Sequence, residues 1–212
     1  MITALLLWTV APGHVIQANP SGGVVVHGDV RMSGAGANLL VHQGSRNAII
    51  NWDRFSIAAG ESTRFVQPDR ASAVLNRVTG GDPTEIHGSL RGNGSIFVIN
   101  PNGILVGPGG RIDAHGVVLS TLDLDDERFL EGGDYLFKGE GPGGVVNQGR
   151  IEGIGGDVFL IGRTIANHGA IKANGTVGMA AGTEVLLTAK EGASGERMFV
   201  RAGRSGASGD GI

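Results

Sequence analysis

The chain has no cysteine, few aromatic residues (seven Phe, two Trp and one Tyr) and no cluster of basic residues. Without cysteine it forms neither disulfides nor thiolate metal sites. A formal net charge of −3, with no Lys or Arg cluster, gives no reason to expect nucleic acid as a partner. The apolar run at residues 1–11 is too short to span a bilayer.

The usual catalytic signatures are absent as well. The sequence contains no phosphate-binding Gly-x-x-x-x-Gly-Lys loop, no His-Glu-x-x-His and no Gly-x-Ser-x-Gly. Its six histidines are scattered, and none stands at metal-ligand spacing from another. We therefore predict no catalytic residue, no cofactor and no metal site, and a protein that is not an enzyme.

Glycine is the residue that the chain has in excess, at 39 of 212 positions. An interior glycine costs a helix about 1 kcal/mol relative to alanine, so long helices are disfavoured. The glycines keep no three-residue period, which excludes collagen, and 41% hydrophobic residues are too many for a disordered chain. The composition favours an all-β fold of short strands joined by tight turns.

A pattern of Gly-x-(Leu/Ile)-x-(Gly/Ala)-x-Gly, followed by an apolar run, occurs four times. The segments begin at Gly88, Gly110, Gly149 and Gly169, so the separations are 22, 39 and 20 residues and the middle gap is close to two periods. A period of about 20 residues with Gly and Asn at the corners is typical of a β-solenoid. Leucine-rich repeats are excluded by the missing Leu-x-x-Leu-x-Leu spacing, and helical repeats need about 33 residues or more.

The stacking of coils predicts which residues lie above one another. Parallel pairing at about 4.8 Å places like residues in ladders, so Ile112, Ile151 and Ile171 should form an apolar one. We expect the corner glycines to adopt positive φ angles, at which a Cβ atom is penalised.

Two segments depart from the repeat. Residues 22–41 contain short apolar runs separated by Gly and Asn, which predict a hairpin or a meander. Residues 122–138 form an insertion in the middle gap, where acidic residues before Phe129 and Leu130 predict a short helix, followed by a strand at Tyr135–Phe137. The acidic residues of this insertion fit either a cation site or a solvated loop, and the solvated loop is the favoured interpretation.

Two local features stand out from the coils. Trp52 and Phe55 lie close together, which predicts core packing or a plug over one end of the β structure rather than a ligand platform. The segment 100–103, Asn-Pro-Asn-Gly, has no copy elsewhere in the chain, and its Pro and Gly positions fit a type I turn. Asn100 and Asn102 can each bond nearby backbone. Geometry alone favours a rigid corner.

Four segments, in order, resemble the N-terminal two-partner-secretion (TPS) domain of filamentous-haemagglutinin- and haemolysin-type exoproteins. They are Ala48–Phe55, Leu75–Gly80, Ile86–Leu90 and Val98–Ile104, and the likeness covers residues 20–190. The resemblance implies a right-handed parallel β-helix with an N-terminal β cap and small extra-helical excursions. The family's two signature segments fall here on Asn76, Arg77, Val78, Thr79 and Gly80, and on Asn100, Pro101, Asn102, Gly103 and Ile104.

The same resemblance implies a function. It is that of a secretion and recognition domain of a large exported adhesin, haemolysin or contact-dependent toxin, which passes through the periplasm and is secreted or held at the bacterial cell surface. The implied partner is an outer-membrane TpsB-type β-barrel transporter with periplasmic POTRA domains, and the folding β-helix is nucleated at the cell surface. A host-surface ligand would bind through a downstream region.

The resemblance also divides the chain. Residues 1–18 fit a remnant of a signal peptide, and their apolar run at 1–11 fits a buried first strand equally well. Residues 19–193 fit the secretion domain, and residues 194–212 fit a frayed tail or a cut point toward a downstream region. Two rival functions remain. An adhesive β-helix would bind host glycan or protein directly. A β-helix polysaccharide lyase or hydrolase would need clustered charges on one coil face, and the mixed set at equivalent positions argues against it: Asp113, Glu152 and Lys172.

Overall fold

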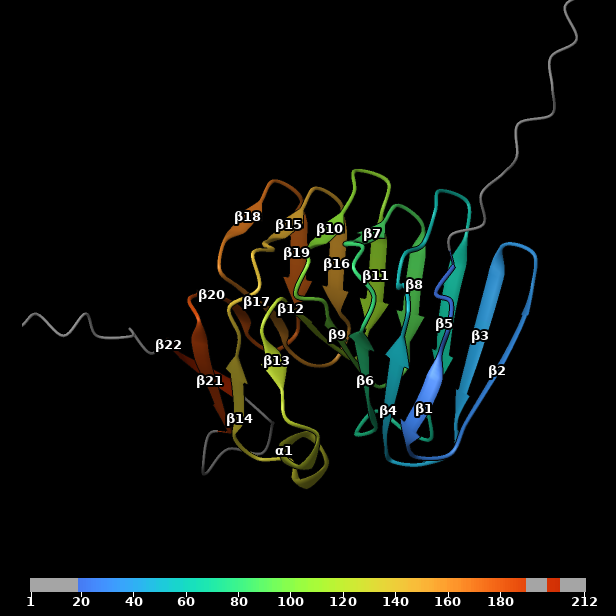
Figure 1. Ribbon diagram of the computed structural model, residues 1–212, viewed down its shortest axis with the longest axis horizontal. Helices are drawn as coiled ribbons and strands as arrows, with labels where there is room; N and C mark the ends of the chain where they lie inside the picture. The colour runs from blue at the N-terminus through green and yellow to red at the C-terminus, as the bar shows by residue number, and fades with distance from the viewer. Residues whose placement is uncertain (1–18, 190–197, 203–212) are drawn as a thin grey trace, which may run out of the picture.

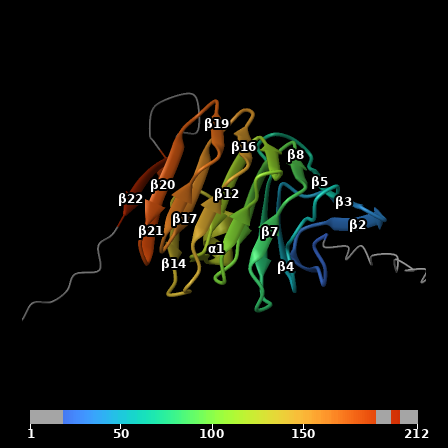
Figure 2. The same ribbon diagram turned by 90° about the horizontal axis from the view of Figure 1, so that it is seen from above.

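The computed structural model describes residues 19–189 and 198–202. Within them the chain winds into stacked coils around an apolar interior, and the coils follow one another along the long axis of the molecule (Figures 1 and 2). A coil has three strands, and the strands of successive coils pair in parallel to form three sheets. The predicted parallel β-helix is therefore confirmed.

Four coils give one strand to each sheet, and the coil before them reaches the second sheet only through the isolated bridge between Ile57 and Ile86. The first sheet contains, in spatial order, β1 (Val24–His27), β4 (Asn47–Trp52), β6 (Ala73–Val78), β9 (Ser95–Ile99), β12 (Gly116–Ser120), β17 (Val158–Gly162) and β20 (Val177–Ala181). The second sheet contains β7 (Thr84–Ile86), β10 (Ile104–Val106), β15 (Val145–Asn147) and β18 (Ile165–Asn167). The third sheet contains β2 (Val30–Ala35), β3 (Asn38–Gln43), β5 (Ser62–Val66), β8 (Ser89–Gly92), β11 (Arg111–Ala114), β16 (Arg150–Gly153) and β19 (Ala170–Ala173).

The N-terminal end of the helix is covered by antiparallel strands. β1 pairs antiparallel with β4, and β2 and β3 form the hairpin predicted for residues 22–41. β3 then pairs in parallel with β5, so the hairpin joins the third sheet and begins the stack. The signal peptide or first strand proposed for residues 1–18 lies outside the described residues.

The isoleucine ladder is present in the predicted register. Ile112 pairs with Ile151, and Ile151 pairs with Ile171, while Leu90 continues the row toward the N-terminus. Leu90, Ile112 and Ile151 are fully buried in the interior of the coils. Because each coil exposes its inward row until the next coil covers it, the apolar ladder makes the stability of one coil depend on its neighbours.

The expected reason for the repeat glycines is wrong. The positive φ angles among the described residues fall on glycines outside the repeat, such as Gly60 and Gly103. The repeat glycines are instead places of close backbone approach: a Cβ atom on Gly110 would lie 2.0 Å from the carbonyl oxygen of Ile86, and one on Gly149 would lie 2.3 Å from that of Gly110. A side chain is excluded at these positions because the backbone of the preceding coil lies at strand-pairing distance, and not because of the φ angle.

The 39-residue gap in the repeat is one coil with an excursion, not two coils. β11 pairs directly with β16, so no complete coil lies between them. The excursion contains β13 (Asp123–Leu124), the helix α1 (Asp126–Glu131) and β14 (Tyr135–Lys138), which confirms the predicted helix and strand. Asp125 caps α1 by accepting a hydrogen bond from Arg128 N at 3.1 Å. No helix among the described residues has the length and apolar character needed to cross a membrane.

The excursion creates a second apolar core on the outer face of the first sheet. In Figure 1 it lies in front of that sheet, where β14 also pairs with β21 (Glu184–Ala189), and β21 pairs with β22 (Met198–Ala202). Phe97 of β9 meets Phe129 and Tyr135 edge to face, with ring centroids 5.3 and 5.7 Å apart. Of the tail after residue 193, the structure describes only β22.

Candidate functional site

The two signature segments meet at one corner of the helix. Residues 76–80 comprise the last part of β6 and the turn that follows it. Residues 100–104 lie one coil later, where they connect β9 to β10. β6 and β9 pair in parallel, so Asn76 lies beside Val98. The segments are joined directly, because Asn102 Nδ2 donates a hydrogen bond to Gly80 O at 2.9 Å. We call this place the signature corner.

Asn100 is the buried centre of the corner. Its side-chain oxygen accepts from Asn102 N at 3.0 Å and its carbonyl accepts from Gly103 N at 3.1 Å, so the turn expected from the sequence is present. Its Nδ2 atom donates to Asp82 O and to Thr84 Oγ1, both at 3.0 Å. With no exposed surface and both ends of the amide bonded, Asn100 holds its own turn against the preceding coil.

The following coil closes over the same turn. Gly143 N donates to Pro101 O at 3.1 Å, and Ile104 N donates to Gly144 O at 3.0 Å. A Cβ atom on Gly143 would lie 2.3 Å from Gly103 N, so only glycine lets the two backbones approach this closely. The corner is therefore held between residues 80–84 on one side and 141–144 on the other.

Asn76 points inward and serves the aromatic cluster. Its Oδ1 accepts from Trp52 Nε1 at 3.0 Å, and its Nδ2 donates to Phe97 O at 3.1 Å. Trp52 and Phe55 are each 1% exposed and meet edge to face, with ring centroids 5.7 Å apart, inside the coils near the N-terminal end. A buried indole N–H needs an acceptor, and Asn76 supplies it.

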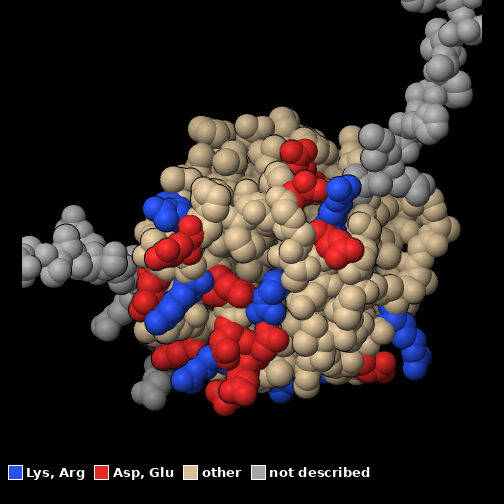
Figure 3. All heavy atoms as spheres, viewed as in Figure 1, with Lys and Arg blue, Asp and Glu red and all other residues tan. Residues whose placement is uncertain are grey.

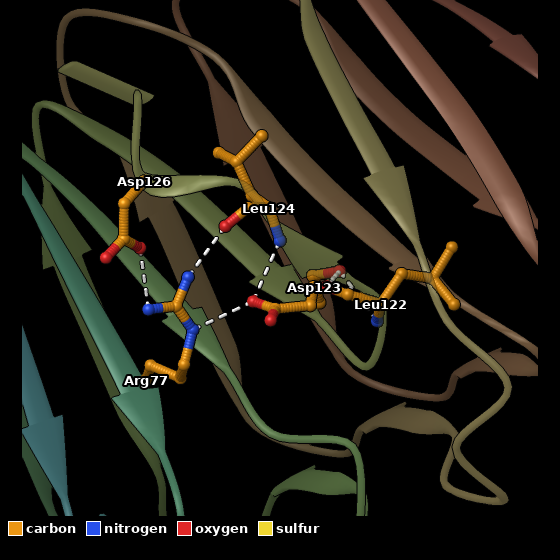
Figure 4. A network of polar contacts seen from close by, with 6 residues as sticks. Arg77, Leu122, Asp123, Leu124 and Asp126 are labelled. Atoms are coloured by element: carbon orange, nitrogen blue, oxygen red, sulfur yellow. Dashed lines mark hydrogen bonds and ion pairs between the residues drawn. The ribbon is translucent and has the colours of Figure 1, made fainter. Parts of the chain in front are cut away.

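Arg77 points outward and holds the excursion (Figure 4). Its Nε lies 2.9 Å from Asp123 Oδ1, and its Nη2 donates to Leu124 O at 2.6 Å. Its Nη1 forms an ion pair with Asp126 Oδ1 at 2.7 Å. Burial lowers the pKa of Arg77, but hydrogen bonds and charges from the two carboxylates outweigh burial and raise it above its ordinary value.

The acidic insertion is thus more than a solvated loop. Figure 3 shows acidic side chains gathered over the excursion with basic ones among them. Asp123 and Asp126 pair with Arg77, and Asp125 caps α1. No group of three His, Asp or Glu side chains in the described part of the chain is arranged to hold a metal ion.

The other signature residues divide by exposure. Val78 and Ile104 are buried in the interior of the coils, at 4% and 2% exposure. Thr79 is exposed, and both its backbone N and its Oγ1 donate to Trp52 O, at 2.8 and 3.2 Å. The side chain of Asn102 is also exposed, while Pro101 is half-buried. In the folded domain, Thr79 and Asn102 are the exposed members of the signature.

Sequence reasoning missed the partners that these residues use. Asp82 and Thr84 hold Asn100, and Leu124 with the two aspartates holds Arg77. For Arg77 the sequence did contain a signal, because an acidic run begins 46 residues later, at Asp123. The register of the coils was needed to bring the two together.

The rival catalytic site is not supported by the coil positions. Asp113, Glu152 and Lys172 do lie at equivalent positions, as predicted. They bind partners within the sheet: Glu152 lies 2.8 Å from Arg150 and 3.3 Å from Lys172, and Asp113 pairs with Arg111. Such a ladder is an ordinary surface network.

Comparison with known proteins agrees with this architecture. A family model described as the TPS secretion domain matches residues 16–206. The crystal structure of the HMW1 secretion domain from Haemophilus influenzae matches with a TM-score of 0.77 and 30% identity, over 86% of this chain and 48% of that one. The filamentous hemagglutinin secretion domain matches with a TM-score of 0.56 and 19% identity, over 88% of this chain and 71% of that one, which supports the fold alone.

Among curated proteins, the chain is similar to a heme/hemopexin-binding protein of Haemophilus influenzae strain Rd, with 32% identity over 178 residues. The match covers 80% of this chain and 20% of that protein, so the chain spans about a fifth of the length of this relative. With the family model covering most of its length and the same β-helix in the HMW1 secretion domain, the chain belongs to the TPS secretion domain family, whose exoproteins are secreted across the outer membrane.

Proposed function

We propose that this domain is the part of an exported protein that an outer-membrane TpsB-type β-barrel transporter recognises in the periplasm through its POTRA domains. The exported protein then reaches the cell surface or the medium, where the β-helix folds. Membership of the TPS family supports the class of partner. The chain also lacks cysteine, so no disulfide can form in an oxidising periplasm and obstruct export.

The observation that carries the proposal is the burial of the signature. Asn76 and Asn100 have no exposed surface in the folded domain, and their amides are bonded to protein groups. A transporter that reads these side chains must therefore meet the chain before the coils stack. An extended chain offers free strand edges to a partner by β-augmentation, and side chains at alternate positions supply specificity.

Folding then removes what the transporter reads. Stacking of the coils pairs the strand edges and buries both asparagines, so a transporter domain can no longer bind them. Of the signature residues, Thr79 and Asn102 stay exposed. Recognition and folding use the same backbone and amide groups. Folding outside the cell thus disfavours return of the chain.

The test is secretion by the cognate transporter, with Asn102→Ala compared with Asn174→Ala. The two residues make matched contacts, because each exposed amide donates to a carbonyl oxygen of the preceding coil: Asn102 to Gly80 at 2.9 Å and Asn174 to Ile154 at 2.7 Å. We expect Asn102→Ala to slow secretion and Asn174→Ala to leave it unchanged. Circular dichroism of both purified variants separates a defect of fold from a defect of recognition.

Equal secretion of the two variants, with both folded, would remove the recognition role of the signature. A second measurement addresses the state that is recognised. Purified periplasmic domains of the transporter should bind chain freshly diluted from urea and should not bind the refolded domain. Equal affinity for both states would contradict recognition before folding.

A further inference from the structure

The chain contains three Asn-Gly pairs, and each lies at a corner between two strands. They are Asn93-Gly94, Asn102-Gly103 and Asn174-Gly175. Asparagine is most prone to deamidation when glycine follows it, because glycine has no Cβ atom to keep its backbone nitrogen away from the side-chain carbon of the asparagine. The three pairs therefore carry the same local reactivity, and only the fold can make them differ.

Folding holds both reacting groups of the pair in the signature corner. Asn102 Nδ2 donates to Gly80 O at 2.9 Å, and Gly103 N donates to Asn100 O at 3.1 Å. Gly103 is buried, and residues 141–144 of the following coil close over the turn. Deamidation needs the glycine nitrogen to leave its acceptor and the amide to rotate toward it, so the corner must first open.

The pair at Asn93 is held in a similar way. Its Nδ2 donates to Gln67 O and its Oδ1 accepts from Gln67 N, both at 2.8 Å. Gly94 is buried, and its N donates to Gln67 Oε1 at 2.9 Å. The following coil covers this corner as well, because His115 N donates to Gly94 O at 3.0 Å. One glutamine of the preceding coil thus binds every polar group that takes part in the reaction.

The pair at Asn174 is held from one side. Asn174 Nδ2 donates to Ile154 O at 2.7 Å, and Gly175 N donates to Gly156 O at 3.0 Å. Gly175 is exposed, and the neighbouring strands β19 and β20 are the last of their sheets in the described part of the chain. This corner should open more readily than the other two, which lie between stacked coils.

We propose that Asn102 is a deamidation site of the unfolded chain, that stacking of the coils protects it, and that its modified forms cannot rebuild the signature corner. In the reaction, the nitrogen of Gly103 bonds to Cγ of Asn102 and the Cγ–Nδ2 bond breaks. The N–H proton of Gly103 leaves with the amide nitrogen as ammonia, and a succinimide remains. Water then opens the ring at either carbonyl, to give aspartate or isoaspartate at position 102.

Both products lose the contact between Asn102 and Gly80. A carboxylate at position 102 has no proton to donate and brings negative charge against the carbonyl oxygen of Gly80. In isoaspartate the main chain runs through Cγ, which adds one atom to a turn that is held between residues 80–84 and 141–144. The time that the chain spends unfolded therefore limits how much of it can still fold. This inference is independent of recognition by a transporter, because any unfolded period exposes Asn102.

The first experiment follows deamidation of the folded native chain in mildly alkaline buffer, by peptide mapping with mass spectrometry. Short peptides around the three asparagines, in the same buffer, give the rate of each site without a fold. Relative to its own peptide, we expect the folded chain to slow Asn93 and Asn102 by about tenfold or more, and Asn174 by less. Reaction of folded Asn102 as fast as its peptide would overturn the proposal, and so would Asn174 being the most protected site.

The second experiment tests refolding. Native chain is aged in guanidinium chloride and refolded, and a protease then removes what stays unfolded. Deamidation at Asn102 should be depleted in the surviving fraction, whereas deamidation at Asn174 should be retained. Asn102→Asp isolates the aspartate product, and its denaturation midpoint should lie below that of the matched control Asn174→Asp. If both modified sites are retained equally, or if the two variants share one midpoint, the corner accepts the modified residue and the proposal fails.

Discussion

Replacing Arg77 by alanine should loosen the excursion while leaving the coils intact. The guanidinium contacts Asp123, Leu124 and Asp126, and no other described side chain reaches the excursion with three polar contacts. Without it, Phe129 of α1 keeps its contact with Phe97 and Leu124 of β13 stays in the second apolar core, but the excursion loses its polar anchor. The interior of the coils makes none of these contacts, so the effect should be confined to the second core.

The magnitude follows from the exposure of the partners. A hydrogen bond to a charged group contributes about 1.5–3 kcal/mol, and breaking a fully buried ion pair costs about 3–5 kcal/mol. The Arg77 side chain is 16% exposed, but those of Asp123 and Asp126 are 55% and 39% exposed, so water replaces part of what is lost. We expect a loss of about 2–3 kcal/mol in the free energy of unfolding. For a chain of this size that lowers the melting temperature by roughly 5–10 °C.

The assay is urea denaturation combined with hydrogen exchange. Arg54→Ala is the matched control, because Arg54 and Asp82 form an exposed ion pair, at 69% and 60% exposure, that should contribute about 0–1 kcal/mol. A double-mutant cycle with Asp126→Asn isolates the pair energy. Exchange should rise in residues 123–138 and not in the isoleucine ladder. If Arg77→Ala costs no more than Arg54→Ala, or if the ladder loosens first, the reasoning fails.

Three further predictions concern the coils. Gly110→Ala should destabilise the domain by about 1–3 kcal/mol or more through the clash with the preceding coil, whereas Gly81→Ala, where a Cβ atom meets nothing within 4 Å, should be close to neutral in the same denaturation assay. Ile151→Ala should cost about 2–5 kcal/mol, whereas Ile154→Ala, at 57% exposure, should change the midpoint by less than about 0.5 kcal/mol. Folding lowers the pKa of Glu152, so its contribution to stability is complete above the pKa of the unfolded chain and is lost as pH falls through the pKa of the folded chain. The denaturation midpoints of the native chain and of Glu152→Gln should therefore differ at neutral pH and converge in acid.

The repeat was readable from the sequence because a parallel coil places like residues above like. The spacing of Ile112, Ile151 and Ile171 predicts their ladder, and the structure has the same register. Turn chemistry was equally local, since Asn100 fixes the bend through its own next residues. Features that depend on one coil and on its period are encoded within about 20 residues, and a single sequence shows them.

Contacts between coils were not readable. The role of Gly110 depends on a carbonyl oxygen 24 residues earlier, and only the stacked backbone reveals it. Asn102 looked like a second turn stabiliser, but it bonds Gly80 of the preceding coil. The acidic run that binds Arg77 could not be assigned to this arginine from the sequence, because the run lies in an excursion whose length does not follow the repeat. These residues act between segments, so their roles follow from register and not from spacing.

The burial of the signature has a thermodynamic consequence that can be measured. If the transporter's periplasmic domains bind only chain in which Asn76 and Asn100 are free, linkage requires them to destabilise the folded domain, in which both are buried. The shift in apparent stability is RT ln(1 + [L]/Kd), about 2.7 kcal/mol when the free concentration is 100 times Kd. The urea midpoint should therefore fall as periplasmic domain is added, and should fall less for the Asn102→Ala variant, whose binding is weaker. A midpoint that rises would mean that the partner prefers the folded coils, and the signature would then have to act through its exposed members, Thr79 and Asn102, alone.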